Sequence, residues 1–348
     1  MDTHPNSWLL TISERLYSSL LLLYPKDFRS DYQQEMICTF RDYAHDTIQQ
    51  AGKPGLLRMW SIVLSDLLIT TCIENYRSCM QTIRMFIGLE KESIMVSPIL
   101  HLDFGSQTDI GLKRANNEDT MISVLPADPQ VMQQRGALFI VADGLGGQSK
   151  GEVASDMVVN EVKKLYYADL TNPIETALLN AVKQANTLLY DYQTGKDDTH
   201  ESMGTTCIAA VLHNDSAYIA NVGDSRAYIV HQDTIRQISL DHSWVAEQIN
   251  AGKMTPEEAL THPQRNIITR CVGTKPEVEV DIFTEHVSDG DTLVLCTDGL
   301  SWEVSAQEIL TTVIQSTPEE SVGRLIALAN EHGGPDNITA VVARISLT

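Results

Sequence analysis

The most informative stretch of the chain is Val141-Ala142-Asp143-Gly144-Leu145-Gly146-Gly147, and an altered copy follows as Leu295-Cys296-Thr297-Asp298-Gly299-Leu300. Both are typical of an apolar β-strand that ends in Asp-Gly. The strand holds the carboxylate rigidly, and the glycine lets backbone and ligand approach closely. Asp119 and Asp336 supply two further carboxylates. Hard oxygen ligands of this kind hold Mg²⁺ or Mn²⁺ in proteins, so the sequence predicts a metal site suited to hydrolysis.

The charge of the chain is unevenly distributed. The 348 residues include 43% hydrophobic residues, enough for a real core, and carry a net charge of −21. Residues 101–348 hold 16 Lys and Arg against 35 Asp and Glu, a balance of −19, and residues 1–100 account for −2. A strongly acidic surface repels nucleic acid and anionic lipid, so we expect neither as a partner.

The cysteines and apolar runs indicate a cytoplasmic protein without a membrane span. None of the six cysteines is spaced as Cys-x-x-Cys, and a reduced compartment fits them best. The longest apolar stretches, 20–23 and 62–73, are too short or too interrupted to cross a bilayer. The N-terminus lacks the pattern of a signal peptide.

Residues 1–93 show helical patterns only. One stripe at 3.6-residue spacing consists of Leu9, Ile12, Leu16, Leu20 and Leu23. A second helix follows Pro25, and a third runs from Leu57 to about Met85 after the break at residues 52–55. Three helices with short connections predict a small all-α bundle, and residues 94–100, which contain Pro98, are the expected linker.

Two stretches of this region resemble a helical prefix found ahead of some bacterial membrane-transport permeases. They are Tyr24-Pro25-Lys26-Asp27-Phe28-Arg29 and Gly55-Leu56-Leu57-Arg58-Met59-Trp60. The resemblance covers about 70 residues and implies an interaction or regulatory module with an unknown partner. No cluster of catalytic residue types occurs here.

From residue 101 the pattern changes to short β-rich runs. The expected strands are 121–124, 138–142, 205–212, 217–222, 227–230, 292–296 and 338–345. The expected helices are about 151–168, 173–193 and 318–332. Strands in runs and helices in pairs predict an α+β domain with mostly antiparallel sheets.

Several polar motifs accompany these strands, and each is weak alone. Arg114 stands four residues before the pair Glu118-Asp119, and an arginine can bind a phosphate through two parallel hydrogen bonds. Gly223-Asp224-Ser225-Arg226 could be only a hairpin turn, and Asp336-Asn337 could cap a bend. Their joint occurrence in this order, with each acid at a strand edge, is the evidence for a shared site.

Taken together, residues 101–348 resemble the metal-dependent type 2C protein serine/threonine phosphatases in their bacterial form. The match includes Met203-Gly204-Thr205-Thr206, Asp241-His242-Ser243-Trp244 and Asn266-Ile267-Ile268-Thr269-Arg270. The resemblance implies a sandwich of two antiparallel β-sheets flanked by helix pairs. It also implies a metal cluster at one end, between the sheets, with the segment 241–270 as a flap beside it.

The resemblance further implies roles for individual residues. The metal ligands would be Asp143 as the bridging carboxylate, Gly144 through its carbonyl, Asp298, Asp336, and Glu118 and Asp119 directly or through water. Asp224 would help to hold a weaker third ion. Two Mn²⁺ or Mg²⁺ ions would activate a water that attacks phosphorus, with Arg114 absorbing charge on the phosphoryl oxygens.

Two positions depart from the family pattern. Leu145 stands where eukaryotic members often place a histidine as general acid, so that acid is unidentified. Trp302 stands four residues after Asp298, where an acidic residue is common, which puts the third ion in doubt. His242 could donate a proton, yet Asp241 or Ser243 could equally cap a helix there, which makes His242 structural.

The leading hypothesis is hydrolysis of phosphoserine and phosphothreonine in proteins. The partners would be phosphorylated proteins, with a serine/threonine kinase and its substrates as further candidates. One alternative is a partner-switching phosphatase that acts on an anti-anti-sigma-type regulator. Another is an inactive phosphatase fold used as a binding module, although all four central metal acids are present.

Overall fold

The structure is a computed structural model that divides the chain into two compact units, residues 1–95 and 96–348. It describes residues 7–24, 36–41, 43–45, 47, 54–56, 58–60, 63–64, 100–146, 150–194 and 203–347. Residues 65–85 of the predicted third helix, residues 25–35 and most of the predicted linker (94–99) lie outside this set. Within the set, no helix is both long and apolar enough to cross a membrane.

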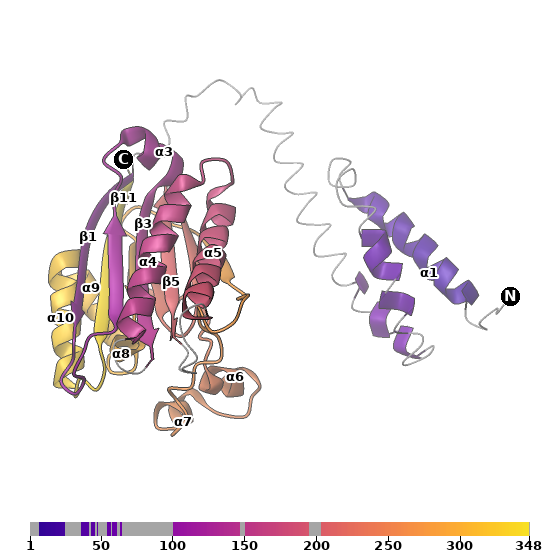
Figure 1. Ribbon diagram of the computed structural model, residues 1–348. Coiled ribbons are helices and arrows are strands. Elements are labelled where there is room, and N and C mark those ends of the chain that lie inside the picture. The colour runs from indigo at the N-terminus through magenta and orange to yellow at the C-terminus, as the bar shows by residue number, and fades with distance from the viewer. Residues whose placement is uncertain are drawn as a thin grey trace. The chain divides into compact units, whose positions relative to one another are not determined.

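The described part of the first unit is helical. Helix α1 (Ser7–Leu20) continues into the short 3₁₀ helix η1 (Leu21–Leu23), and further helical segments lie between residues 36 and 64 (Figure 1). Tyr17 stacks on Phe40 with ring centroids 4.1 Å apart, and Trp60 contacts the same Phe40 ring. Apolar side chains from separate helical segments therefore form a common core.

Of the described residues in the leucine stripe predicted for the first helix, only Leu20 packs against the core. Leu16 and Leu23 are 54% and 55% exposed, whereas Tyr17 and Leu21 are buried. The buried face is thus turned by about one residue from the predicted leucine stripe. The reason is that ring stacking and the larger apolar area of Tyr17 outweigh a stripe counted from leucines alone.

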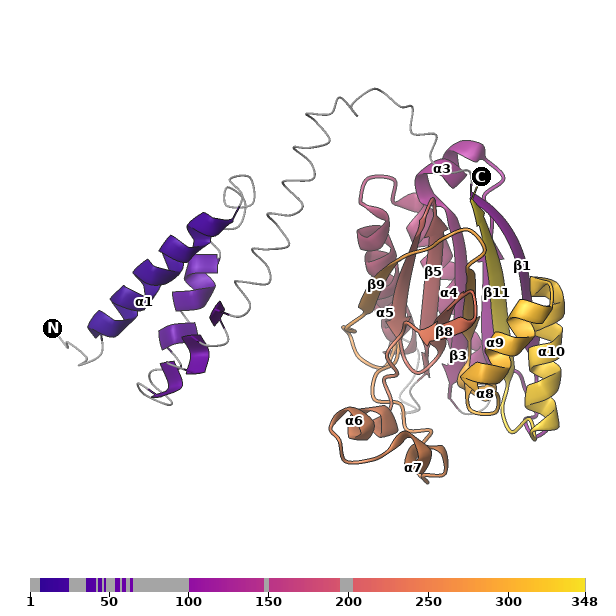
Figure 2. The ribbon, with the colours of Figure 1, turned by 180° about the vertical axis from the view of Figure 1, so that it is seen from behind.

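The second unit is a four-layer sandwich with helices outside and two antiparallel sheets inside (Figures 1 and 2). One sheet has the order β1-β11-β10-β7-β8, formed by Leu100–Asp109, Ile338–Leu347, Thr292–Cys296, Arg226–His231 and Thr234–Gln237. The other has the order β2-β3-β5-β6-β9, formed by Asp119–Val124, Ala137–Leu145, Cys207–His213, Ser216–Val222 and Asp281–His286. The two-residue strand β4 (Gly204–Thr205) pairs with the end of β3. The predicted α+β sandwich is confirmed.

Helices cover both outer faces. α4 (Lys150–Ala168) and α5 (Ile174–Thr194) pack on the β2-β3-β5-β6-β9 sheet, and α9 (Ala306–Gln315) and α10 (Pro318–Glu331) pack on the other. Shorter helices are α3 (Pro129–Arg135), α6 (Trp244–Asn250), α7 (Pro256–Leu260) and α8 (Asp298–Ser301). The last three lie at the end of the sandwich where the flap projects (Figure 2).

Strand β3 shows why the central runs are continuously apolar. Its residues Leu138 and Ile140 face α4 and α5, while Phe139 and Val141 face the opposite sheet. A strand that is buried on both faces has no polar alternation to display. Strand β1, by contrast, is half polar, and Leu100, the expected last residue of the linker, is its first residue.

Candidate metal centre

The two Asp-Gly pairs lie in different local structures. Asp143-Gly144 lies within the last three residues of β3, as predicted. Asp298-Gly299 instead opens helix α8, because β10 already ends at Cys296 and Thr297 is the N-cap residue of the helix. Both carboxylates nevertheless lie at the same end of the sandwich, where they line one cavity of about 190 Å³.

That cavity brings together most of the predicted site residues. It is lined by Arg114, Glu118, Asp143, Gly144, Leu145, Gly146, Asn266, Ile268, Asp298, Asp336 and Asn337. The predicted residues Asp119 and Asp224 do not line it. Both are buried. The negative charge of each also raises the pKa of Asp143, which does line the cavity.

Asp119 is placed by strand pairing. It is the first residue of β2 and lies directly opposite Asp143 in the register with β3. Its Oδ2 accepts hydrogen bonds from the hydroxyls of Thr297 and Thr339, at 2.8 and 2.7 Å. Its Oδ1 is buried and has no hydrogen-bond partner among the residues that the structure describes. One oxygen of Asp119 is therefore satisfied by two hydroxyl donors, whereas the other is buried without a described donor, which is uncommon for a carboxylate.

The segment with Asp224 corrects the hairpin interpretation. Strand β6 ends at Val222 in one sheet, and β7 begins at Arg226 in the other. Residues 223–225 therefore cross between the sheets. Within the described part of the chain, both carboxylate oxygens of Asp224 are buried without a hydrogen-bond partner.

The glycines of both Asp-Gly pairs are required by close backbone approach. A Cβ on Gly144 would lie 2.1 Å from the carbonyl oxygen of Gly151 and 2.6 Å from that of Glu118. A Cβ on Gly299 would lie 2.0 Å from the carbonyl oxygen of Asn337. Neither position has room for a side chain, so both glycines let the segments that carry the acids pack against one another.

Arg114 and Asp336 form an ion pair at the cavity, 2.6 Å from Nη2 to Oδ2. Burial lowers the pKa of Arg114, but the hydrogen bond and charge of Asp336 outweigh it and the net shift is upward. The Arg114 side chain is still 49% exposed. Its guanidinium is thus held at the cavity while part of it remains open to an incoming anion.

Asn337 is a site residue that sequence reasoning assigned only to a possible cap. Its side chain is 4% exposed and donates to the carbonyl oxygens of Ile110 and Asn116, both at 2.9 Å. Its Oδ1 accepts from the backbone N–H of Glu118 at 2.8 Å. One side chain therefore fixes both ends of the loop that carries Arg114.

The electrostatics of the cavity are those of crowded buried acids. Burial, reduced by the two threonine hydrogen bonds and reinforced by neighbouring carboxylates, raises the pKa of Asp119 to about 7. Burial and the charge of Asp336 raise the pKa of Asp298 to about 6. Burial and neighbouring acids also raise the pKa values of Asp143 and Asp224. Among the described residues, the charges of Arg114 and Arg226 lower the pKa of Asp298 but only partly offset the upward shift that burial and the other acids cause.

Among the described residues, no three His, Cys, Asp or Glu side chains are arranged so that they could enclose an ion as they stand. Asp336 is directed to Arg114, and Asp119 to two threonines. Asp119, Asp224 and Asp298 nevertheless have buried carboxylate oxygens without a partner among the described residues. These oxygens are stronger evidence for a metal site than the lack of a preformed ligand group is against one. Like-charged carboxylates repel one another and turn to whatever donors surround them, whereas a buried charge without a partner is costly. The donor set fits hard divalent cations.

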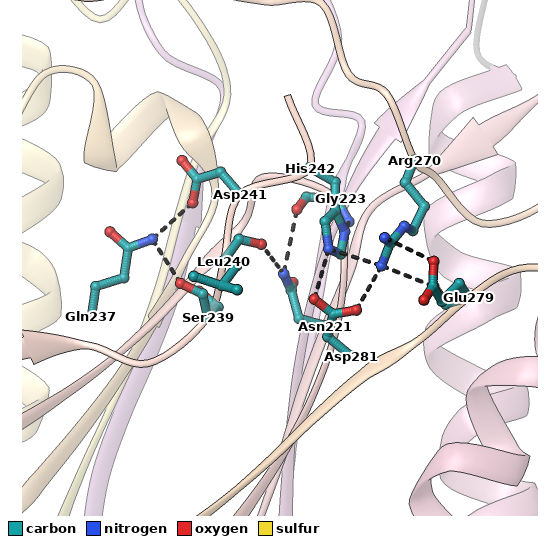
Figure 3. A network of polar contacts seen from close by, with 10 residues as sticks. All are labelled: Asn221, Gly223, Gln237, Ser239, Leu240, Asp241, His242, Arg270, Glu279 and Asp281. Atoms are coloured by element: carbon teal, nitrogen blue, oxygen red, sulfur yellow. Dashed lines mark hydrogen bonds and ion pairs between the residues drawn. The ribbon is translucent and has the colours of Figure 1, made fainter. Parts of the chain in front are cut away.

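His242 lies outside this cavity, in the polar network of Figure 3. Its Nδ1 accepts from the N–H of Gly223 at 3.0 Å, and its Nε2 lies 3.0 Å from Asp281. Ser243 is the N-cap residue of α6, which supports the structural interpretation of this motif. Burial lowers the pKa of His242. It lines a separate cavity of about 440 Å³ that shares none of the metal-cavity residues.

The sequence model of the family described as protein phosphatase 2C matches residues 128–330. The chain belongs to this family. The serine/threonine phosphatase stp of Listeria innocua is 38% identical over 255 residues, which are 71% of this chain and 97% of that protein. The protein phosphatase PhpP of Streptococcus pneumoniae is 36% identical over 245 residues, 69% of this chain and 95% of that one.

Solved phosphatases of this family share the fold. The Mycobacterium tuberculosis serine/threonine phosphatase PstP/Ppp has a TM-score of 0.63 at 35% identity, over 70% of this chain and 99% of that chain. A structure of the catalytic domain of PstP with two manganese ions has a TM-score of 0.62 at 34% identity, over 71% and 99%. This chain is accordingly a metal-dependent protein serine/threonine phosphatase of the 2C type.

Proposed function

We propose that the carboxylates at the 190 Å³ cavity hold two divalent ions, Mn²⁺ or Mg²⁺, for the phosphatase reaction. The proposed ligands are the predicted set of Asp143, Gly144, Asp298, Asp336, Glu118 and Asp119, with Asp224 toward a third, weaker site. The observation that carries the proposal is the group of buried carboxylate oxygens at this end of the sandwich that have no hydrogen-bond partner in the described part of the chain. When bound, the ions would neutralise these charges and acidify a water that attacks the phosphoryl group.

Within this scheme Arg114 binds the phosphate. Its guanidinium is half exposed, and its present partner Asp336 is itself a proposed ligand. Release of Arg114 from Asp336 would free its Nη2 donor for a phosphoryl oxygen and one carboxylate for a cation. A charge-assisted, bidentate contact of this kind orients the phosphate and offsets the charge that develops on it.

The substrates would be phosphorylated proteins, including targets of a serine/threonine kinase and the kinase itself. We place the enzyme in the cytoplasm, where the buried free thiols of Cys207 and Cys296 stay reduced. Residues 1–93 would act as an interaction or regulatory module with a partner of their own. Their described core is formed by their own helical segments, which supports a separate role.

Hydrolysis of p-nitrophenyl phosphate and of a phosphothreonine peptide tests the metal chemistry. The purified full chain should be active with added Mn²⁺ or Mg²⁺ and inactive in excess EDTA. Activity should return when metal is restored. Full activity after verified metal removal would overturn the proposal.

Truncation tests the module. A chain that starts at Ile99 keeps all of β1 and should hydrolyse p-nitrophenyl phosphate within about twofold of the full chain. It should also lose any partner that the full chain retains in a pull-down from its native cytosol. A truncated chain that is insoluble, or inactive although loaded with metal, would contradict the two-module view.

A further inference from the structure

Trp302 links a proposed metal ligand to the flap. It is the residue after helix α8, and its backbone N–H donates to the carbonyl oxygen of Asp298 at 2.9 Å. It therefore lies one helical turn beyond that acid. Its ring is half-buried and not part of any of the three large apolar cores of the catalytic unit. Core filling does not account for a tryptophan here.

Two guanidinium groups lie over the Trp302 ring. The Cζ atom of Arg226 is 5.8 Å from the ring centroid, and that of Arg265 is 5.4 Å away. Arg226 is held firmly, because its Nε and Nη2 donate to both carboxylate oxygens of Asp241. Arg226 belongs to strand β7, whereas Arg265 belongs to the flap. The ring thus connects a fixed cation of the sheet with a cation of the projecting segment.

Arg265 in turn organises the part of the flap that reaches the metal cavity. Its Nη1 donates to the carbonyl oxygen of Leu260, the last residue of α7, at 3.0 Å. The next residue, Asn266, and then Ile268 line the metal cavity. A displacement of Arg265 would therefore move the flap wall of the cavity.

The base of the flap is attached independently of Trp302. Ser243 and Ile268 form an isolated β-bridge, and the backbone N–H of Trp244 donates to the carbonyl oxygen of Ile267 at 2.8 Å. The ring of Trp244 also stacks on that of His262, with centroids 4.9 Å apart. Loss of the Trp302 contact should therefore loosen the flap without detaching it.

We infer that Trp302 is a positioning residue that holds the flap against the metal cavity through Arg265, and that it thereby sets the selectivity for phosphopeptides. The inference rests on the proposed function of the cavity and deepens it. A small aryl phosphate needs only the metal acids and Arg114. A phosphopeptide extends beyond the cavity and must also pass the flap wall formed by Asn266 and Ile268.

Steady-state kinetics of the full chain at saturating Mn²⁺ test this inference. Trp302→Leu removes the ring face and should raise KM for a phosphothreonine peptide about three- to tenfold, the range expected for one cation–π contact. kcat for p-nitrophenyl phosphate should stay within about twofold. Arg265→Met should have the same effect, and the double variant should be no worse than either single one. Trp302→Phe and Arg265→Lys are matched controls that should restore most of the peptide affinity.

Hydrogen–deuterium exchange supplies a second measurement that does not depend on activity. Amides of residues 261–270 should exchange faster in Trp302→Leu than in wild type, with Trp302→Phe in between. Additive effects of the two single variants, an unchanged peptide KM, or a fall in Mn²⁺ affinity equal to the loss of peptide affinity would overturn the inference. A wild-type chain inactive with Mn²⁺ would overturn the proposed function instead, and exchange of the flap would still decide the Trp302 contact.

Discussion

Replacement of Asn337 by alanine should destabilise the catalytic unit and weaken catalysis together. Asn337 makes three hydrogen bonds, two to the carbonyl oxygens of Ile110 and Asn116 and one from the N–H of Glu118. A typical hydrogen bond contributes roughly 0.5–1.5 kcal/mol net, so the loss should be about 3 kcal/mol. In a unit of this size that corresponds to a fall in Tm of about 6–12 °C.

Scanning calorimetry of the full chain measures this fall in Tm. The measurement is made in EDTA so that the result does not depend on how much metal is bound. Asn337→Asp is a useful companion, since it keeps the acceptor for Glu118 but turns a carboxylate oxygen toward two carbonyl oxygens. It should be at least as destabilising as alanine. Asn160→Ala is the matched control, because Asn160 is exposed and, among the described residues, its side chain bonds to Asp156 on the same helix. Its Tm should stay within about 1–2 °C of wild type.

The catalytic consequence follows from the position of the loop. Asn337 holds the segment that carries Arg114 and Glu118, so its loss should lower kcat and weaken inhibition by inorganic phosphate. Equal melting temperatures for Asn337→Ala and Asn160→Ala would refute the reasoning. So would a large loss of stability with unchanged phosphate inhibition, since the loop would then not depend on Asn337.

Three further expectations concern the acids, the arginine and the histidine. Asp143→Asn and Asp298→Asn should each lower kcat at least about a hundredfold, because second-shell changes alone cost about 10–100-fold. In EDTA both variants should have a Tm no lower than that of wild type, since each substitution removes a buried repelling charge. A fall in kcat of tenfold or less at saturating Mn²⁺ would mean that the ligands are misassigned. Arg114→Ala should weaken inhibition by phosphate while calorimetric Mn²⁺ affinity stays equal or tightens, because the ion pair with Asp336 is gone; a fall in Mn²⁺ affinity with unchanged phosphate inhibition would make Arg114 structural. Burial lowers the pKa of His242, so the folded chain keeps the imidazole neutral while the unfolded chain takes up a proton below about pH 6.5. His242 therefore lowers the free energy of unfolding as the pH falls through that value. The Tm of His242→Gln should change less between pH 7.5 and 5.5 than the Tm of wild type. Parallel plots of Tm against pH for the two proteins would contradict the assignment.

Local sequence patterns predicted much of the catalytic unit. The runs at 138–142, 217–222 and 292–296 are strands because β-branched and aliphatic residues fill both faces of a buried sheet. The helices at 151–168, 173–193 and 318–332 agree with α4, α5 and α10 to within a residue or two. Amphipathic periodicity and turn residues are properties of neighbouring positions, so they can be recognised without the fold.

Other elements have no such local signal. Strand β1 is half polar and is defined by its pairing with β11, more than 200 residues away. The crossing of residues 223–225 between sheets cannot be distinguished from a hairpin turn by composition, because Gly-Asp-Ser suits both. The phase of α1 depends on stacking between Tyr17 and Phe40 from another helical segment.

The sequence by itself predicted which residues could hold metal and phosphate, since an aspartate after an apolar run and an arginine four residues before Glu118-Asp119 are local patterns. Only the tertiary structure decided how they are arranged. It placed Asp119 opposite Asp143, turned Asp336 toward Arg114, and made Asn337 the support of the Arg114 loop. Those contacts join residues up to 227 positions apart, as in the hydrogen bond from Asn337 to the carbonyl oxygen of Ile110. Spacing along the chain carries no information about them, because packing of the two sheets brings these strand ends together.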